Sequence, residues 1–125
     1  MIIIDGQSFN VPILSLDETC DFLDKYAERT EDGTLRRELI GVYFNQQLKF
    51  GFIGVPTATM QALWEKLTEP VEFHTVVVPD EDGDNFTFTA YFAGVKRSLL
   101  KSTTPKTYWK SLTVNFIGKA PARKP

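Results

Sequence analysis

Apolar and polar residues alternate over the longest patterned stretch of the chain, residues 36–53 (RRELIGVYFNQQLKFGFI). Every second residue from Ile40 to Phe52 is apolar except Gln46, whereas the residues between them are mixed. A period of two indicates a β-strand, or two strands in register, with one face on a core and the other towards water or a partner. Since most strands are much shorter, we expect a bend or a reversal near Asn45 and Gln46.

Shorter strands are expected on both sides of this stretch. Asp5-Gly6 separates two short segments near the N-terminus, a strong hairpin signal because both residues of a type I′ turn need positive φ. A second hairpin is expected around the acidic turn DEDGDN at residues 80–85. The predicted short strands are residues 1–4, 7–11, 71–78, 86–95 and 107–117.

The clearest helix signal lies at residues 57–68. Apolar residues recur there at helical spacing, namely Met60, Leu63, Trp64 and Leu67. Thr57 or Thr59 can cap the start, and Pro70 prevents continuation of the helix. We expect this stripe to lie across a sheet, with Trp64 as its largest buried side chain.

A second helix is a candidate at residues 16–27. Ser15 and Glu18 form a capping-box pattern, and the apolar residues that follow have spacings of four, three and four. The competing interpretation of the same residues is an irregular strand that uses Phe22 and Tyr26.

The order of these elements predicts an α+β fold that is mainly antiparallel β: a sandwich or half-open barrel with the amphipathic helix 57–68 packed on it. A chain of 125 residues corresponds to one domain. We place this β-rich domain at residues 1–118 and a Pro-rich basic tail, which cannot be regular structure, at residues 119–125. The predicted core is Ile3, Ile40, Val42, Phe44, Leu48, Phe50, Met60, Leu63, Trp64, Leu67, Phe73, Phe88, Phe92, Leu112, Val114 and Phe116.

Composition and net charge limit the classes of partner that the protein is expected to bind. The net charge of −2 gives no overall attraction to nucleic acid or to an anionic membrane. No apolar run reaches the roughly 18 residues of a membrane span, and the N-terminus MIIIDGQ does not have the pattern of a secretory signal. The one cysteine, Cys20, excludes an intramolecular disulfide. We therefore expect synthesis in a reducing cytoplasm and no partner among nucleic acids, membranes or small molecules.

Catalytic and metal-binding patterns are not found in the sequence. His74 is the only histidine and has no second ligand at metal spacing, and Cys20, expected to be a buried inert thiol, has no base assigned to it. The acidic turn at residues 80–85 does not fit the spacing of a calcium-binding loop. There is no phosphate-binding glycine loop, G-x-S-x-G or H-E-x-x-H. We expect a non-enzymatic protein without cofactor or metal.

Basic residues provide the candidate binding sites. Residues 96–106 (KRSLLKSTTPK) are expected to form a basic loop whose cations and two leucines dock on an adjacent subunit. The residues predicted to bind a partner are Arg36, Arg37, Lys96, Arg97, Lys101, Lys106 and Arg123.

Several segments in sequence order carry a resemblance to a known family. DGTLRR at residues 32–37 is followed by ELIGVYFNQQLKFG, then by ALWEKLTEPVEFHTVVVP, and the chain ends in YWKSLTVNFIGKAPARKP. This layout, over most of the chain from residue 32 onward, resembles the small phage and prophage tail-region proteins of Gram-positive, Clostridium-like bacteria. The resemblance implies a structural or assembly protein near the tail tube, terminator or baseplate, with other tail proteins and itself as partners, rings as oligomers and the virion tail as location.

Two other function classes stay open. A small-ligand or carbohydrate-binding β domain would need an aromatic-lined cavity with converging polar groups; its candidate lining residues are Tyr43, Tyr91, Tyr108 and Trp109. An enzyme of unrecognised type would need a cleft that holds His74 or clustered acids with perturbed ionisation.

Overall fold

The structure is a computed structural model that describes residues 2–79, 85–104 and 106–125. The strands within these residues form one antiparallel sheet in the order β2-β1-β5-β6-β7-β4-β3. A mostly antiparallel β-rich fold with a packed helix is thus confirmed, whereas a sandwich of two sheets is not. In sequence order the elements are β1 (Ile2–Ile4), β2 (Gln7–Phe9), β3 (Ile13–Arg29), β4 (Leu35–Gly51), α1 (Thr57–Leu67), β5 (His74–Pro79), β6 (Asn85–Ser102) and β7 (Thr107–Gly118).

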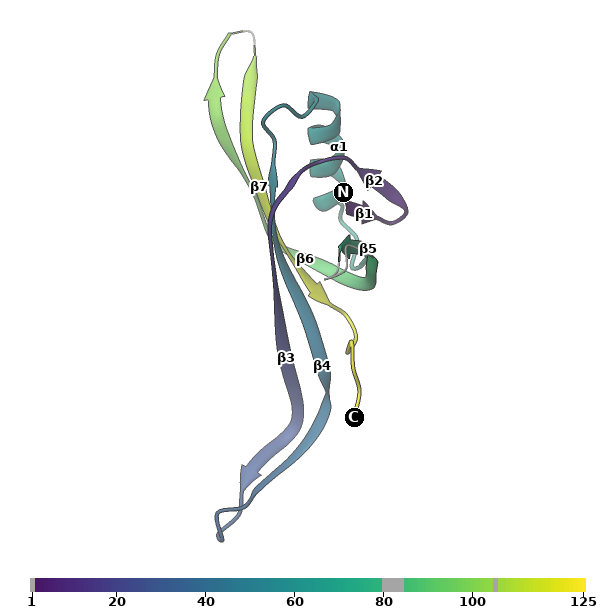
Figure 1. The fold of residues 1–125 in the computed structure, drawn as a ribbon, viewed down its shortest axis with the longest axis vertical. Coiled ribbons are helices and arrows are strands. Elements are labelled where there is room, and N and C mark those ends of the chain that lie inside the picture. The colour runs from purple at the N-terminus through teal and green to yellow at the C-terminus, as the bar shows by residue number, and fades with distance from the viewer. Residues whose placement is uncertain (1, 80–84, 105) are drawn as a thin grey trace.

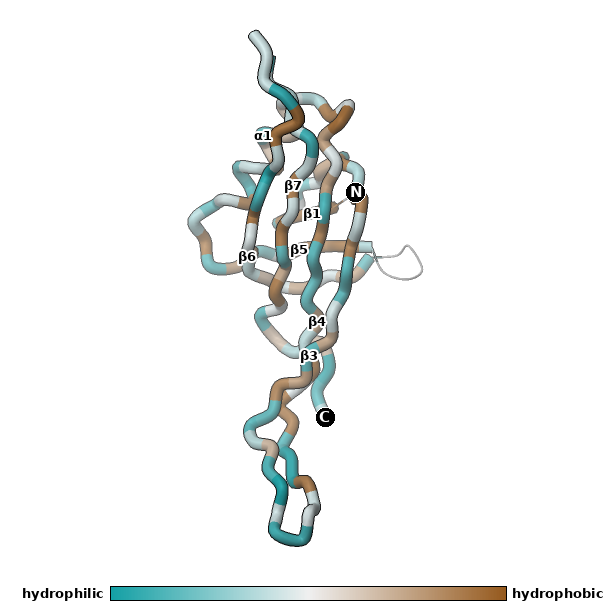
Figure 2. The backbone as a smooth tube through the Cα atoms, turned by 90° about the vertical axis from the view of Figure 1, so that its left-hand side faces the viewer, coloured by the Kyte–Doolittle hydropathy of each residue, from teal (hydrophilic) through white to brown (hydrophobic). Residues whose placement is uncertain are grey.

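Two long β-hairpins leave the body at opposite ends of an elongated molecule (Figure 1). Residues 19–45 of β3 and β4 lie beyond the part of β4 that pairs with β7, and we call them the β3–β4 arm. At the other end β6 and β7 extend beyond β5, which pairs with β6 only as far as Ala90. We call residues 96–110 the β6–β7 arm. Figure 2, turned by 90°, shows the same long axis, with β6, β7, β4 and β3 side by side and the tip of the β3–β4 arm below the body.

The core lies between α1 and the sheet, which bends so that β1, β2, β5 and α1 are on one side of β4 and β7 (Figure 1). Seven predicted core residues are buried: Leu48, Phe50, Leu63, Leu67, Leu112, Val114 and Phe116. The core also contains residues that were not predicted, namely Ile2, Ile4, Phe9, Val11, Phe52, Val76, Val78 and Ala90. Fully burying a large apolar side chain is worth about 1.5–3 kcal/mol, so the N-terminal hairpin is a substantial part of this core.

Some of the predicted core residues lie elsewhere. Ile40 and Phe73 are exposed, Ile40 because it lies on the β3–β4 arm, far from α1, and Phe73 because it precedes β5. Ile3 is only partly buried because the alternation of β1 turns Ile2 and Ile4 inward instead. The remaining six are half-buried around the core: Val42, Phe44, Met60, Trp64, Phe88 and Phe92.

The second helix predicted at residues 16–27 is wrong, because these residues lie within strand β3. β3 pairs with β4 along almost its entire length, with bulges near Leu23 and Asp24. An amphipathic helix at these residues would have no core against which to pack its apolar stripe, whereas β4 supplies backbone hydrogen-bond partners over the same length. The alternative, an irregular strand containing Phe22 and Tyr26, is the one that forms.

Of the bend or reversal predicted near Asn45 and Gln46, the reversal is wrong, since β4 runs without interruption from Leu35 to Gly51. Gln46 keeps its inward place in the alternation, is almost fully buried and donates from Nε2 to Glu18 Oε2 at 2.7 Å. A partner on the neighbouring strand therefore lets a polar side chain occupy an apolar position.

The basic loop predicted at residues 96–106 is mostly strand. β6 continues to Ser102, and β7 begins at Thr107. A register shift between Ala93 and Lys96, with Gly94 at φ 63°, marks a β-bulge where β6 enters the arm. A bulge of this kind increases the local twist of a strand, and the arm starts directly after it.

Two local predictions are confirmed. Asp5 and Gly6 have φ of 51° and 82° and connect β1 to β2. Helix α1 occupies the predicted segment, although Pro56 stands at its N-cap and no side chain caps it. The buried residues of α1 are Leu63 and Leu67, whereas Trp64 is only partly buried.

The C-terminal tail, residues 119–125, is irregular as expected and lies against the β3–β4 arm. Val42 N donates to Arg123 O at 2.9 Å, and Ala122 N donates to Val42 O at 2.8 Å. Pro121 lies over Gly41, where a β-carbon would come within 2.5 Å of it. The tail thus covers part of the inner edge of β4, which β7 does not reach.

Candidate functional site

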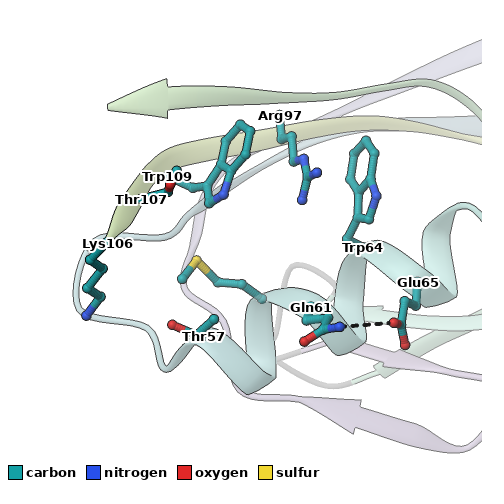
Figure 3. A pocket seen from close by; sticks show the side chains of 9 residues that line it. Thr57, Gln61, Trp64, Glu65, Arg97, Lys106, Thr107 and Trp109 are labelled. Atoms are coloured by element: carbon teal, nitrogen blue, oxygen red, sulfur yellow. Dashed lines mark hydrogen bonds between the residues drawn. The ribbon is translucent and has the colours of Figure 1, made fainter. Parts of the chain in front are cut away.

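A groove lies between helix α1 and the β6–β7 arm (Figure 3). Its volume is about 510 Å³, within the range of ligand pockets. Both walls carry aromatic, polar and charged side chains: Thr57, Met60, Gln61, Trp64 and Glu65 from α1, and Arg97, Lys106, Thr107 and Trp109 from the arm. We call this set the arm groove.

The geometry of helix and arm brings these side chains together. In α1, Leu63 and Leu67 face the core, so Met60 and Trp64 on the adjoining side reach the groove. On the arm, Arg97 pairs with the buried Leu112 of β7, and directly paired residues point to the same face of a sheet. Arg97 therefore points from the sheet towards α1.

Arg97 is held between two tryptophans. Its guanidinium carbon lies 4.1 Å from the ring centre of Trp64 and 4.2 Å from that of Trp109. Figure 3 shows the side chain inserted between the two indoles. Such contacts are favourable because the ring faces carry partial negative charge, and they fix the orientation of a planar cation whose N–H donors lie at its edge.

An apolar pocket of about 430 Å³ continues from the arm groove towards the end of the arm. It shares the walls formed by Met60, Lys106 and Trp109 and adds Leu100 and Tyr108 from the arm. Ile53, in the turn before α1, also lines it and is 71% exposed. Groove and pocket together form an apolar surface with a cationic rim, and such surfaces mark interaction sites.

The β6–β7 arm is strongly basic. Residues 96–110 contain five cations and no Asp or Glu. Lys101 and Lys106 both lie over the ring of Tyr108, with their Nζ atoms 4.9 and 5.1 Å from its centre. Four of the seven predicted partner-binding residues, Lys96, Arg97, Lys101 and Lys106, therefore gather on one arm.

The other three predicted binding residues lie at the opposite arm. Arg37 forms an ion pair with Asp24 across the β3–β4 arm and lies over the ring of Phe22. Arg36 is exposed and lies opposite Glu28 in the register of β3 and β4. Arg123 contacts the arm through its backbone at Val42. The structure thus divides the predicted residues between two surfaces.

The turn at the tip of the β3–β4 arm is acidic and internally braced. The turn contains one cation, Arg29, and three acids, Glu28, Glu31 and Asp32. The guanidinium of Arg29 donates to Gly33 O at 2.7 Å. The Thr30 hydroxyl and the Thr34 amide donate to Asp32 and lower the pKa of its carboxyl. Asp32 is therefore ionised down to a lower pH than a free aspartate.

His74 takes part in a separate polar cluster. It is almost fully buried, stacks on Phe92 with ring centres 4.5 Å apart, and its Nδ1 lies 2.7 Å from Asp5 Oδ2. Lys66 Nζ lies 3.8 Å from Asp5 and 3.1 Å from Glu69. Desolvation raises the pKa of Asp5, but hydrogen bonds from His74 and from the Thr75 amide, with the charges of His74 and Lys66, outweigh it and lower that pKa.

The same cluster is the candidate for a metal site within the described residues. Single ligand atoms of Asp5, Glu69 and His74 lie within 4.8 Å of one another. Lys66, however, already pairs with both carboxylates, and an ammonium there competes with a metal cation for the same charges. Asp5, Lys66 and His74 thus form a structural network of ion pairs and hydrogen bonds that joins the β1–β2 turn to β5 and α1.

The structure also shows where the residues of several other sequence-based expectations lie. Cys20 is exposed on the β3–β4 arm, so the expectation of a buried thiol is wrong. Of the acidic turn at residues 80–85 that was considered for calcium, residues 80–84 lie outside the described residues. The four aromatics considered for a ligand cavity do not line one site: Trp109 and Tyr108 border the arm groove and its continuation, Tyr91 lies near His74, and Tyr43 is on the β3–β4 arm.

Sequence reasoning did not identify the arrangement of Trp64, Arg97 and Trp109. The signal was present in part, because Arg97 lies in the basic segment and Trp109 follows it. Trp64 is 33 positions before Arg97 in the sequence and was assigned to the core, so no local pattern connected the helix to the arm. Within the described residues, no helix is long and apolar enough to cross a membrane.

Comparisons with known proteins do not assign the chain to a family. No protein-family model matches it, and neither a curated protein nor a solved structure matches it significantly.

Proposed function

We propose that this protein is a non-enzymatic structural or assembly component of a phage or prophage tail, near the tail tube, terminator or baseplate, that acts through association with itself and with other tail proteins. The location follows the resemblance of its sequence segments to small tail-region proteins. The association is supported by the shape and surface of the chain. The protein would be made in the bacterial cytoplasm and function in the virion tail.

The observation that carries the proposal is the β3–β4 arm. It is a two-stranded ribbon without a core, and an isolated ribbon of this kind is marginal in water. Large apolar side chains on both of its strands are 44–59% exposed: Phe22, Leu23, Tyr26, Leu35 and Ile40. A surface of this kind is expected to be covered in the working state.

Unpaired strand edges support the same conclusion. Among the strands of the described residues, none lies beside the outer edge of β3, and none pairs with the β5 side of β6 beyond Ala90. Open edges present free N–H and C=O groups that can pair with another chain. An assembly protein can use such edges for contacts, whereas a monomer must protect them.

The experiment is deletion of the gene in its own prophage, followed by induction and electron microscopy of the particles. We expect heads without normal tails, with tails restored by a plasmid copy. Antibody-gold labelling of complete particles locates the protein. Normal, infectious particles after deletion contradict the proposal.

A second candidate, a small-ligand or carbohydrate-binding β domain, is supported by the arm groove, where two indoles flank polar groups. Saturation-transfer NMR with a panel of oligosaccharides tests it. Signal transfer that is lost in Trp109→Ala would favour this function over assembly.

A further inference from the structure

We propose that Arg97 and Lys106 in the arm groove bind the carboxylates of Glu31 and Asp32 at the tip of the β3–β4 arm of a second copy of this chain. The inference rests on the proposed function, because it assigns residues to the self-association proposed there. It names the ligand of the groove as side-chain carboxylates presented on a β-turn.

The groove is built to receive a planar anion. The two tryptophans cover both faces of the Arg97 guanidinium, which leaves the N–H groups at its edge as the binding surface. We find no hydrogen bond or ion pair of Arg97 in residues 2–79, 85–104 and 106–125. A carboxylate can accept two parallel hydrogen bonds from such an edge.

The surroundings of Arg97 favour an anionic partner. Lys106 lines both the groove and the apolar pocket beside it, and the arm that carries both cations contains no acid. Among the described residues that line the groove, Glu65 is the one carboxylate, and it accepts a hydrogen bond from Gln61 at 3.4 Å. The field at the groove is thus positive, while Leu100 and Ile53 offer apolar contact next to it.

The tip of the β3–β4 arm has the complementary properties. Two backbone hydrogen bonds between Thr30, Gly33 and Thr34 fix the turn, so little entropy is lost when it binds. Glu31 and Asp32 stand in this turn, and its one cation, Arg29, is engaged with Gly33 O. Leu35 and Tyr26, both exposed, follow along the arm and can meet the apolar pocket.

The two surfaces lie at opposite ends of the long axis (Figure 1). One copy therefore cannot satisfy its own groove, and a contact between the tip of one copy and the groove of the next is head-to-tail. Such heterologous contacts generate a ring if the rotation closes and a filament if it does not. The contact leaves one free tip and one free groove at the ends of any open chain.

Charge exchange between the two surfaces tests the proposal. The first variant carries Glu31→Lys and Asp32→Lys, and the second carries Arg97→Glu and Lys106→Glu. A milder second variant, Lys106→Glu alone, leaves Arg97 and the two tryptophans in place. The matched control is Glu72→Lys, which reverses one exposed acid outside both arms. Circular dichroism melting establishes that each variant is folded.

Sedimentation velocity over a range of protein concentrations and salt gives the readout. We expect wild type and the control to associate, and each charge variant alone to require at least about tenfold higher concentration. Mixing the two variants should restore association, because every reversed tip then meets a reversed groove. High salt should weaken the wild-type contact.

Four outcomes overturn the proposal. Association of the tip variant at wild-type concentration, or failure of the mixture to recover, shows that the arms do not bind in this way, while the tail assignment stands on its deletion test. Wild type that stays monomeric at every concentration also overturns it. Association that depends on nuclease-sensitive material would instead assign the basic arm to nucleic acid.

Discussion

Replacing Gly41 by alanine should detach the C-terminal tail from the β3–β4 arm without unfolding the body. A β-carbon at residue 41 would lie 2.5 Å from Pro121 Cβ, 2.8 Å from Pro121 Cγ and 3.1 Å from Arg123 O. Contacts this short do not occur between real carbon atoms, and the proline ring is rigid. The tail must therefore move away from β4.

The magnitude follows from the contacts that hold the tail. Val42 N donates to Arg123 O at 2.9 Å, and Ala122 N donates to Val42 O at 2.8 Å. A net value of about 0.5–1.5 kcal/mol for each hydrogen bond gives about 1–3 kcal/mol for local opening. That corresponds to a shift of about 5- to 150-fold in the opening equilibrium. Global stability should change much less, because the released tail regains conformational entropy.

Hydrogen exchange at the Val42 amide measures this opening directly, because that amide donates to the tail. We expect its protection to fall by the factor given above. Gly51→Ala is the matched control in the same strand, since the three atoms nearest to its β-carbon would all belong to the side chain of Leu14, which is exposed and can shift. Unchanged protection in Gly41→Ala, or an equal loss in Gly51→Ala, would refute the reasoning.

Three further predictions concern the body and the arm. Leu63→Ala should lower the free energy of unfolding by about 2–5 kcal/mol in urea titrations, since Leu63 is fully buried, whereas the exposed Gln61→Ala should change it by less than about 0.5 kcal/mol. The pKa of Asp5 is lowered in the folded protein, so its ionised carboxyl stabilises the fold at pH values above the unfolded pKa of 3.8, and this stabilisation is lost as the pH falls through the folded pKa. Asp5→Asn should therefore remove part of the acid dependence of the free energy of unfolding. An identical profile of stability against pH in the variant and the wild type would contradict this. Cys20, exposed on its strand, should react with a maleimide in the native protein as fast as in urea, and strong native protection of a monomer would count against the arm as described.

The sequence and the structure agree where a local pattern and the core act together. The helix at residues 57–68 was predictable because its apolar stripe has both the right spacing and a sheet to cover. Leu112, Val114 and Phe116 alternate inward as expected. The Asp5-Gly6 turn was predictable because positive φ restricts the residue choice.

Disagreement is concentrated in the two arms. Residues 16–27 carry a helical stripe and a capping box, but helix formation in a protein depends mainly on packing of the apolar face. The arm provides no such packing, and pairing with β4 decides the structure. Pairing of β6 with β7 likewise makes a strand of a segment rich in Lys and Ser that was expected to be a loop.

The residue pattern alone predicted a β-rich chain with an amphipathic helix and a basic segment at residues 96–106, and it contained none of the catalytic motifs considered above. The folded structure was needed to show that two hairpins extend from opposite ends and that Arg97 lies between Trp64 and Trp109. The difference comes from separation along the chain, because alternation, turn chemistry and charge runs depend on residues that are close in sequence. Strand order, and the contact of a helix with a distant hairpin, depend on the free energy of burying surfaces that meet only in the folded state.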